Sequence, residues 1–194
     1  MPNLITTVGG ATSNSYLTIE EANDYFDTRL PIAGWTNADE DTKAALLIMA
    51  TRTLDSLLTP LKTYVPASGS ASAYFRVRRA WTGSPASTTQ RLAWPRSGMY
   101  DRNGNAIPTT VIPHELKEAT AELAGQLSIS DRTLDNEASV QGLKSVSAGS
   151  VSLSFKDYIE AKVLPDAVWN LLPPSWYSEE IIIPAFTALF DVIG

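Results

Sequence analysis

The 194-residue sequence has no cysteine and only one histidine. Without cysteine it forms no disulfide and offers no thiolate to a metal, which fits a protein made in a reducing cytoplasm. The histidine, His114, follows Pro113 in the first turn of a predicted helix, where we expect it to be exposed. A general base or metal ligand needs convergent partners, and the sequence places none near His114. Catalytic motifs such as Gly-x-Ser-x-Gly, a Walker-type loop or His-Glu-x-x-His are missing as well. We therefore expect no enzyme, no catalytic residue, no metal and no cofactor.

Long hydrophobic runs are also missing. The longest apolar stretches, residues 44–50 and 181–190, fall far short of the roughly 20 residues that span a bilayer. Residues 1–10 lack the basic region and apolar run of a signal peptide. We expect a soluble protein without a membrane partner.

Charged residues make up only 19% of the chain, and they are unevenly spread. The window from Lys62 to Arg102 holds seven cations and one anion, a net charge of +6, whereas the remainder carries −12 and the whole chain −6. An acidic body with a basic middle segment indicates that this segment has a partner of its own.

Helical periodicity predicts three main helices. The first begins at Thr18, whose hydroxyl forms a capping box with Glu21, and it ends near Arg29, before Pro31. Thr36 and Asn37 are the expected caps of the second. The second and third helices are predicted at residues 38–58 and 113–130, and a short helix is predicted at 166–172.

The rest of the chain favours loops and short strands. Residues 74–81 read as a short strand, and alternating apolar residues and serines between 146 and 155 predict a β-hairpin. The fold class is therefore mainly α: a small helical bundle with a β-hairpin and extended arms at both ends. We divide the chain into an N-terminal arm at 1–17, a domain at 18–174 with long loops at 62–112, and a C-terminal tail at 175–194.

Four blocks of sequence, in order, resemble a bacteriophage family labelled DnaT-like. They are Ser13-Asn14-Ser15-Tyr16-Leu17-Thr18 with Glu20-Glu21-Ala22-Asn23-Asp24-Tyr25-Phe26; Gln90-Arg91-Leu92-Ala93-Trp94-Pro95-Arg96; Ile112-Pro113 leading to Ala119, Glu122, Leu123 and Ala124; and residues 146–155 with 164–173. Each block alone is modestly specific, and their ordered succession is more so. The tail at 175–194 lies outside this pattern.

The resemblance implies a structural head-to-tail adaptor, or head completion protein, of a tailed phage. Such a connector subunit forms a homo-oligomeric ring, usually twelvefold, in the virion neck after synthesis in the host cytoplasm. Its expected partners are the portal protein, a tail-side neck or tail-completion protein, other copies of itself, and double-stranded DNA that passes through the lumen without sequence-specific binding. The family label implies the alternative of a single-stranded DNA-binding accessory protein.

The basic segment at 74–102 leaves both functions open. It mixes cations with aromatic rings, as single-strand stacking platforms do. Loops of this kind also bind acidic protein partners. Its candidate contact residues, for protein or for DNA, are Arg76, Arg78, Arg79, Trp81, Arg91 and Arg96.

Trp94-Pro95 has a structural interpretation, because a residue before proline favours extended or turn backbone and the tryptophan ring can cover a small core. Arg96 would then bond a carboxylate or a backbone carbonyl.

Two apolar segments are candidate interfaces with the portal or with a neighbouring subunit. The C-terminal tail carries more apolar residues than a free end should expose, and we expect it to order on docking. One face of the predicted hairpin also needs cover. The candidate residues are Ile182, Phe186, Leu189 and Phe190 in the tail and Val151, Leu153 and Phe155 in the hairpin.

Overall fold

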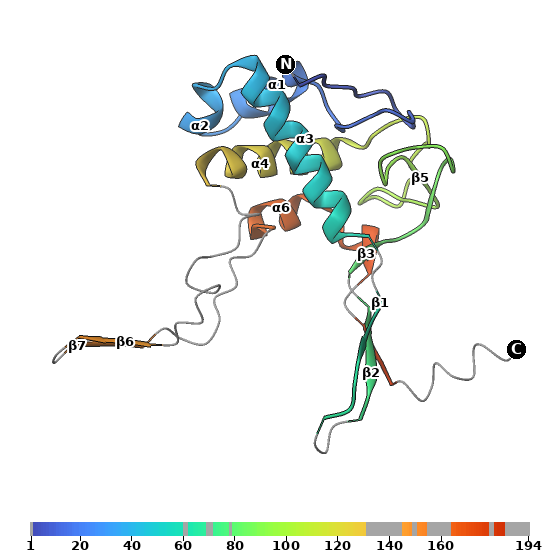
Figure 1. Cartoon of the computed structure of the whole chain (residues 1–194). Coiled ribbons are helices and arrows are strands. Elements are labelled where there is room, and N and C mark those ends of the chain that lie inside the picture. Colours follow the sequence, from blue (N-terminus) through green and yellow to red (C-terminus); the bar gives the residue numbers. More distant parts are fainter. Residues whose placement is uncertain are drawn as a thin grey trace, which may run out of the picture.

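The computed structural model describes residues 2–59, 62–68, 72–77, 79–130, 145–148, 151–154, 164–178 and 181–184. A body of helices carries a narrow antiparallel sheet that projects away from it (Figure 1). The described helices are α1 (Ile19–Asp27), α2 (Ala33–Thr36), α3 (Glu40–Leu57), α4 (His114–Ile129) and α6 (Asp166–Leu171), followed by the 3-10 turn η1 (Pro174–Trp176). None of these helices is long and apolar enough to cross a membrane.

The N-terminus of α1 has the predicted capping box. Thr18 Oγ1 accepts a hydrogen bond from the Glu21 amide at 3.2 Å, and the Glu21 carboxylate accepts one from the Thr18 amide at 2.9 Å. For α3 the prediction is wrong, because Thr36 and Asn37 belong to the end of the unpredicted helix α2. Asp39 caps α3 instead and accepts from the Thr42 amide at 2.7 Å.

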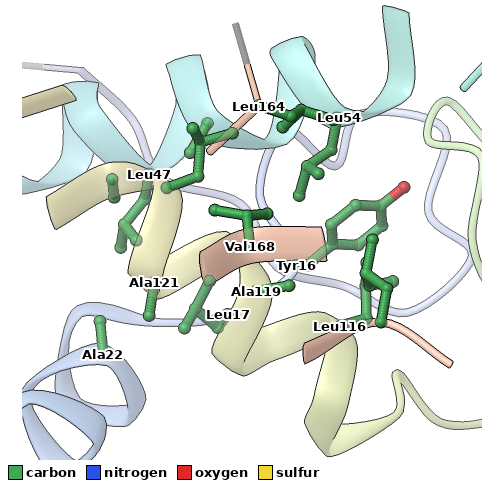
Figure 2. Packing of buried hydrophobic residues seen from close by; sticks show 14 of the residues in the cluster. Tyr16, Leu17, Ala22, Leu47, Leu54, Leu116, Ala119, Ala121, Leu164 and Val168 are labelled. Atoms are coloured by element: carbon green, nitrogen blue, oxygen red, sulfur yellow. The ribbon is translucent and has the colours of Figure 1, made fainter. Parts of the chain in front are cut away.

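Helix α4 lies at the centre of the body. It packs against α1, α2, α3 and α6, so that side chains on most of its circumference are buried. Figure 2 shows Ala119 of α4 near Val168 of α6 and Leu116 of α4 near Tyr16, and Leu54 of α3 is buried in the same cluster. Full burial of a leucine stabilises the fold by about 1.5–3 kcal/mol, so the α3–α4–α6 contact supplies much of the core.

A second part of the core is aromatic. The ring of Trp94 packs edge-on against Trp81 at a centroid distance of 5.7 Å, and it packs at a tilt of 49° against Trp176 at 4.8 Å. All three rings are at most 5% exposed. The expectation that Trp94 covers the core is confirmed, and the Trp94–Pro95 peptide bond is cis.

The strands form four antiparallel groups. Strands β1 (Lys62–Val65), β2 (Tyr74–Val77) and β9 (Ile181–Pro184) make a sheet in the order β1-β2-β9. The other groups are pairs: β3 (Ala80–Trp81) with β8 (Tyr177–Ser178), β4 (Ser84–Pro85) with β5 (Arg96–Ser97), and β6 (Ser145–Ala148) with β7 (Val151–Ser154). The β6–β7 pair confirms the predicted hairpin.

Two of these pairings share one register. Val77 lies opposite Ile181 in the β2–β9 pair, and Trp81 lies opposite Tyr177 in the β3–β8 pair. Trp81 is four positions after Val77, and Tyr177 is four positions before Ile181. The two pairings therefore have the same register. We call the described parts of the segments 74–81 and 177–184 the ribbon, with β3–β8 at the helical body and β2–β9 in the sheet.

The fold is a small mixed structure, roughly as the mainly α prediction expected, with short antiparallel strand pairs added to the helices. Both expected arms take part in it at their inner ends. Tyr16 and Leu17 are 2% and 1% exposed, and Trp176 is fully buried, with its indole N–H donating to the Tyr100 carbonyl at 2.7 Å. Residues 181–184, at the start of the predicted apolar tail, form strand β9.

Candidate nucleic-acid interface

The fold divides the predicted basic aromatic segment between the core and the surface. Trp81 and Arg96, two of its expected contact residues, are 5% and 8% exposed. Both side chains are therefore buried in this structure and do not form part of its exposed surface. Trp81 is buried because its ring completes the tryptophan cluster around Trp94.

Arg96 is held by backbone carbonyls, as the structural interpretation of this block expected. Its Nε donates to Thr82 at 2.6 Å, its Nη1 to Ala93 at 3.1 Å and its Nη2 to Gly83 at 2.9 Å. Burial lowers the pKa of the guanidinium, while nearby Tyr16 and Asp55 oppose this effect. Because all three guanidinium nitrogens donate to backbone carbonyls, Arg96 fixes the loop between β3 and β5.

A buried polar network supports the same loop from α3. Asp55 accepts one hydrogen bond from the Tyr16 hydroxyl and another from the Ala93 amide, the latter at 3.0 Å. The Tyr16 oxygen also accepts from the Trp94 amide at 3.3 Å. Burial raises the pKa of the Asp55 carboxyl and raises the pKa of Tyr16 well above its usual value, the latter with a further contribution from Asp55.

An open pocket of about 710 Å³ lies between the end of α3 and the loop at 84–96. Arg91, a predicted contact residue, lines it and is exposed. Gln90 also lines it, but its side chain is engaged by the loop: Nε2 donates to Leu92 at 2.8 Å and to Pro95 at 3.0 Å. Much of this wall therefore serves to hold the loop together.

The projecting sheet carries an exposed aromatic pair. Tyr64 of β1 lies directly opposite Phe75 of β2, with ring centroids 5.3 Å apart and planes inclined by 57°. Tyr64 is 55% exposed and Phe75 is partly exposed. Residues 62–79 contain four cations, Lys62, Arg76, Arg78 and Arg79, and no anion. An exposed ring pair in such a segment has the composition of a surface for stacking bases near phosphates.

A second aromatic group lies where the ribbon meets the helical body. The Arg79 guanidinium carbon is 5.0 Å from the ring centroid of Trp169 and 5.9 Å from that of Tyr177. The two rings are 4.9 Å apart. All three side chains are partly exposed.

The other predicted site residues fall into three groups. Arg76 and Ile182 face each other in the pairing of β2 with β9, and Val151 and Leu153 lie in β7. For each of these four residues, the structure describes the position of the backbone in its strand. The remaining predicted residues lie outside the described ranges: Arg78, Phe155, Phe186, Leu189 and Phe190.

Three exposed or partly exposed aromatic residues were missed by the sequence analysis: Tyr64, Trp169 and Tyr177. The β-branched and aromatic run Thr63-Tyr64-Val65 is a strand signal that could have revealed the first. No local signal brings Trp169 to Tyr177, because their contact depends on how α6 meets the ribbon.

The single histidine lies on the surface of the body. The His114 side chain is 78% exposed, and its Nδ1 lies 3.3 Å from Oε2 of the adjacent Glu115. Within the described ranges, no three histidine, aspartate or glutamate residues gather where they could hold a metal.

Comparison with known protein families identifies a match to this chain. A family model described as "Putative DnaT-like ssDNA binding protein" matches residues 62–180, more than half of the chain. These residues include the middle and C-terminal blocks of the resemblance, while the block at 13–26 precedes them. No curated protein and no solved structure matched.

Proposed function

The chain belongs to the family described as "Putative DnaT-like ssDNA binding protein", and from that premise we propose that it binds single-stranded DNA on the projecting sheet. The carrying observation is the exposed Tyr64–Phe75 pair. Every base has a π face, so stacking of this kind tolerates any sequence. Stacking contributes about 1–3 kcal/mol per base.

The surrounding charge supports the same proposal. The chain as a whole is acidic, at −6, and would repel phosphates over most of its surface. Residues 62–79, within the basic window, differ from this acidic surface because they contain four cations and no anion. A strand of DNA would therefore be attracted to the sheet and repelled from the acidic remainder. Its affinity should fall as salt rises, since binding releases counterions.

Two tyrosines with nearly equal exposure supply a matched test. Tyr64 is 55% exposed and Tyr100 is 54% exposed. Fluorescence anisotropy with a labelled oligothymidylate of about 20 nucleotides, longer than one small domain covers, measures the affinity of the full chain. We expect Y64A to weaken binding roughly tenfold, given the usual cost of a lost stacking partner, and Y100A to leave it unchanged. The proposal is overturned if the unaltered protein does not bind or if the two variants behave alike.

We propose a head-to-tail adaptor as the second candidate function. The observation that favours it is the same projecting sheet, in which β1 and β9 are the outer strands of the order β1-β2-β9 (Figure 1). An outer strand presents backbone groups to another chain, which suits a portal protein or a neighbouring subunit in a ring. The apolar residues of the tail sequence would add to that interface.

Co-sedimentation with the cognate portal ring tests the adaptor function. The informative truncation ends after Pro184, because it keeps β9 and removes only the residues beyond it. Binding by the full chain and loss of binding by the truncated chain would support docking through the tail. Failure of the full chain to sediment with the portal would overturn the adaptor proposal without affecting the DNA-binding one.

A further inference from the structure

The two exposed aromatic groups lie close together along the chain. Phe75 belongs to β2, and Arg79 directly precedes β3, four positions later. The pairs β2–β9 and β3–β8 on either side have the same register, with Val77 opposite Ile181 and Trp81 opposite Tyr177. Tyr64 joins Phe75 by ring contact, and Tyr177 and Trp169 join Arg79.

The spacing suits a single extended polymer. Four residues of chain span at most about 14 Å. The rings at one end are those of Tyr64 and Phe75, and those at the other end are Trp169 and Tyr177, with the Arg79 cation over them. A planar guanidinium stacks on bases as well as on rings, and it attracts phosphate.

From this arrangement we propose that Arg79, Trp169 and Tyr177 form a second stacking site on the same single strand of DNA. This inference rests on the proposed single-stranded DNA binding, which it extends from the sheet to the helical body. One strand would stack bases on Tyr64 and Phe75, run along the ribbon, and stack again where the ribbon meets α6. We call this set of five residues the stacking track: Tyr64, Phe75, Arg79, Trp169 and Tyr177.

The tryptophans provide a direct readout. Of the five in the sequence, Trp35, Trp81, Trp94 and Trp176 are at most 5% exposed, and Trp169 alone is partly exposed. Quenching of the intrinsic fluorescence by a stacked base should therefore come from Trp169. We expect oligothymidylate to quench the unaltered protein and to leave W169F unquenched. Quenching that persists in W169F would overturn the second site.

Arginine variants test the same site without removing a ring. R79Q should weaken binding of an oligothymidylate of about 20 nucleotides roughly tenfold, in line with the loss of one stacked base. R79K keeps the charge without the planar fork and should weaken binding too. The matched control is R52Q, since Arg52 is exposed on α3 and carries the same charge. Near-UV circular dichroism verifies that each variant keeps its aromatic packing.

The outcomes separate the two proposals. If Y64A weakens binding and R79Q equals R52Q, DNA binds the sheet alone and the second site is overturned. If the unaltered protein binds no oligonucleotide, the proposed function itself fails. If Y64A and R79Q both weaken binding while R52Q does not, the stacking track is supported. An oligothymidylate of about 4 nucleotides, the shortest site size known for single-strand-binding domains, should then bind without the extra affinity that comes from contacting both sites.

Discussion

The hydroxyl of Tyr16 donates a hydrogen bond to the carboxylate of Asp55, 39 positions later in the chain. The same oxygen accepts from the amide of Trp94, which begins the cis peptide bond to Pro95. One phenol thus joins the N-terminal segment, helix α3 and the loop that carries the central tryptophan. Each of the three lies in a different region of the sequence.

Replacing Tyr16 with phenylalanine should destabilise the protein by about 1–3 kcal/mol, the usual cost of leaving buried polar groups unsatisfied. The change removes a donor to Asp55 and an acceptor for the Trp94 amide while keeping the buried ring. Urea unfolding measures the difference. Y100F is the control, because Tyr100 is 54% exposed, and we expect it to unfold like the unaltered protein. Equal midpoints for Y16F and Y100F would contradict the role given to this hydroxyl.

Asp55 should give stability a distinct pH dependence. Burial raises its pKa in the folded state above the ordinary value of 3.8. The folded protein therefore holds this proton more tightly than the unfolded chain, so the stability linked to Asp55 is greatest at acid pH and falls as pH rises through the raised pKa. Relative to D55N, the unaltered protein should gain stability as pH falls from neutrality toward about 4.

The measurement is urea unfolding of both proteins across that pH range. D55N should be less stable at neutral pH, because an amide cannot accept from both Tyr16 and Ala93 as the two carboxylate oxygens do. A stability difference that stays constant with pH would rule out a raised pKa at Asp55.

Arg96 should act through stability alone. R96K keeps the charge but loses the planar fork that reaches the carbonyls of Thr82, Gly83 and Ala93. We expect a loss of about 2 kcal/mol from unsatisfied buried carbonyls. R52K, at an exposed position of α3, should lose nothing. At a temperature where R96K is folded, its affinity for oligothymidylate should equal that of R52K; a selective loss would return Arg96 to the DNA-contact surface.

Gly125 permits the close approach of α4 to the turn after α1. A Cβ at this position would lie 2.8 Å from Ile32 Cδ1 and 2.9 Å from Phe26 Cε1. Alanine favours a helix by about 1 kcal/mol over glycine, but overpacking of a core costs about 1–3 kcal/mol. We expect G125A to be less stable than the unaltered protein in urea unfolding. Adding F26L to G125A should recover part of this loss, because the smaller side chain makes room for the new Cβ. A gain in stability would show that the two helices separate easily.

The sequence predicts the helical body well and the sheet poorly. The capping box at Thr18 and the apolar stripe of residues 38–58 are local patterns, and both appear as helices near the expected positions. The β1-β2-β9 sheet depends on a strand from the C-terminal part of the chain, which no local pattern assigns to Tyr74–Val77.

The sequence predicted which residue types form the candidate site, but it did not predict how they are arranged in space. Cations and aromatic residues between 74 and 102 were recognised, but burial decides which of them meet a partner. Trp81 and Arg96 serve the core, whereas Arg79 lies beside Trp169, a residue ninety positions away. Long-range contacts of this kind are set by the packing of α6 against α4, beyond the reach of a sequence window.

The central position of helix α4 means that the family segment and the folding unit are different things. Residues 62–180 define the family match, yet Leu116 and Leu123 of α4 are buried in a body to which α1, α2 and α3 contribute, and these helices all precede residue 62. Cut out at its family boundaries, the segment would leave an apolar helix face open to water. The segment that matches the family therefore needs the preceding helices α1, α2 and α3 to cover its central helix.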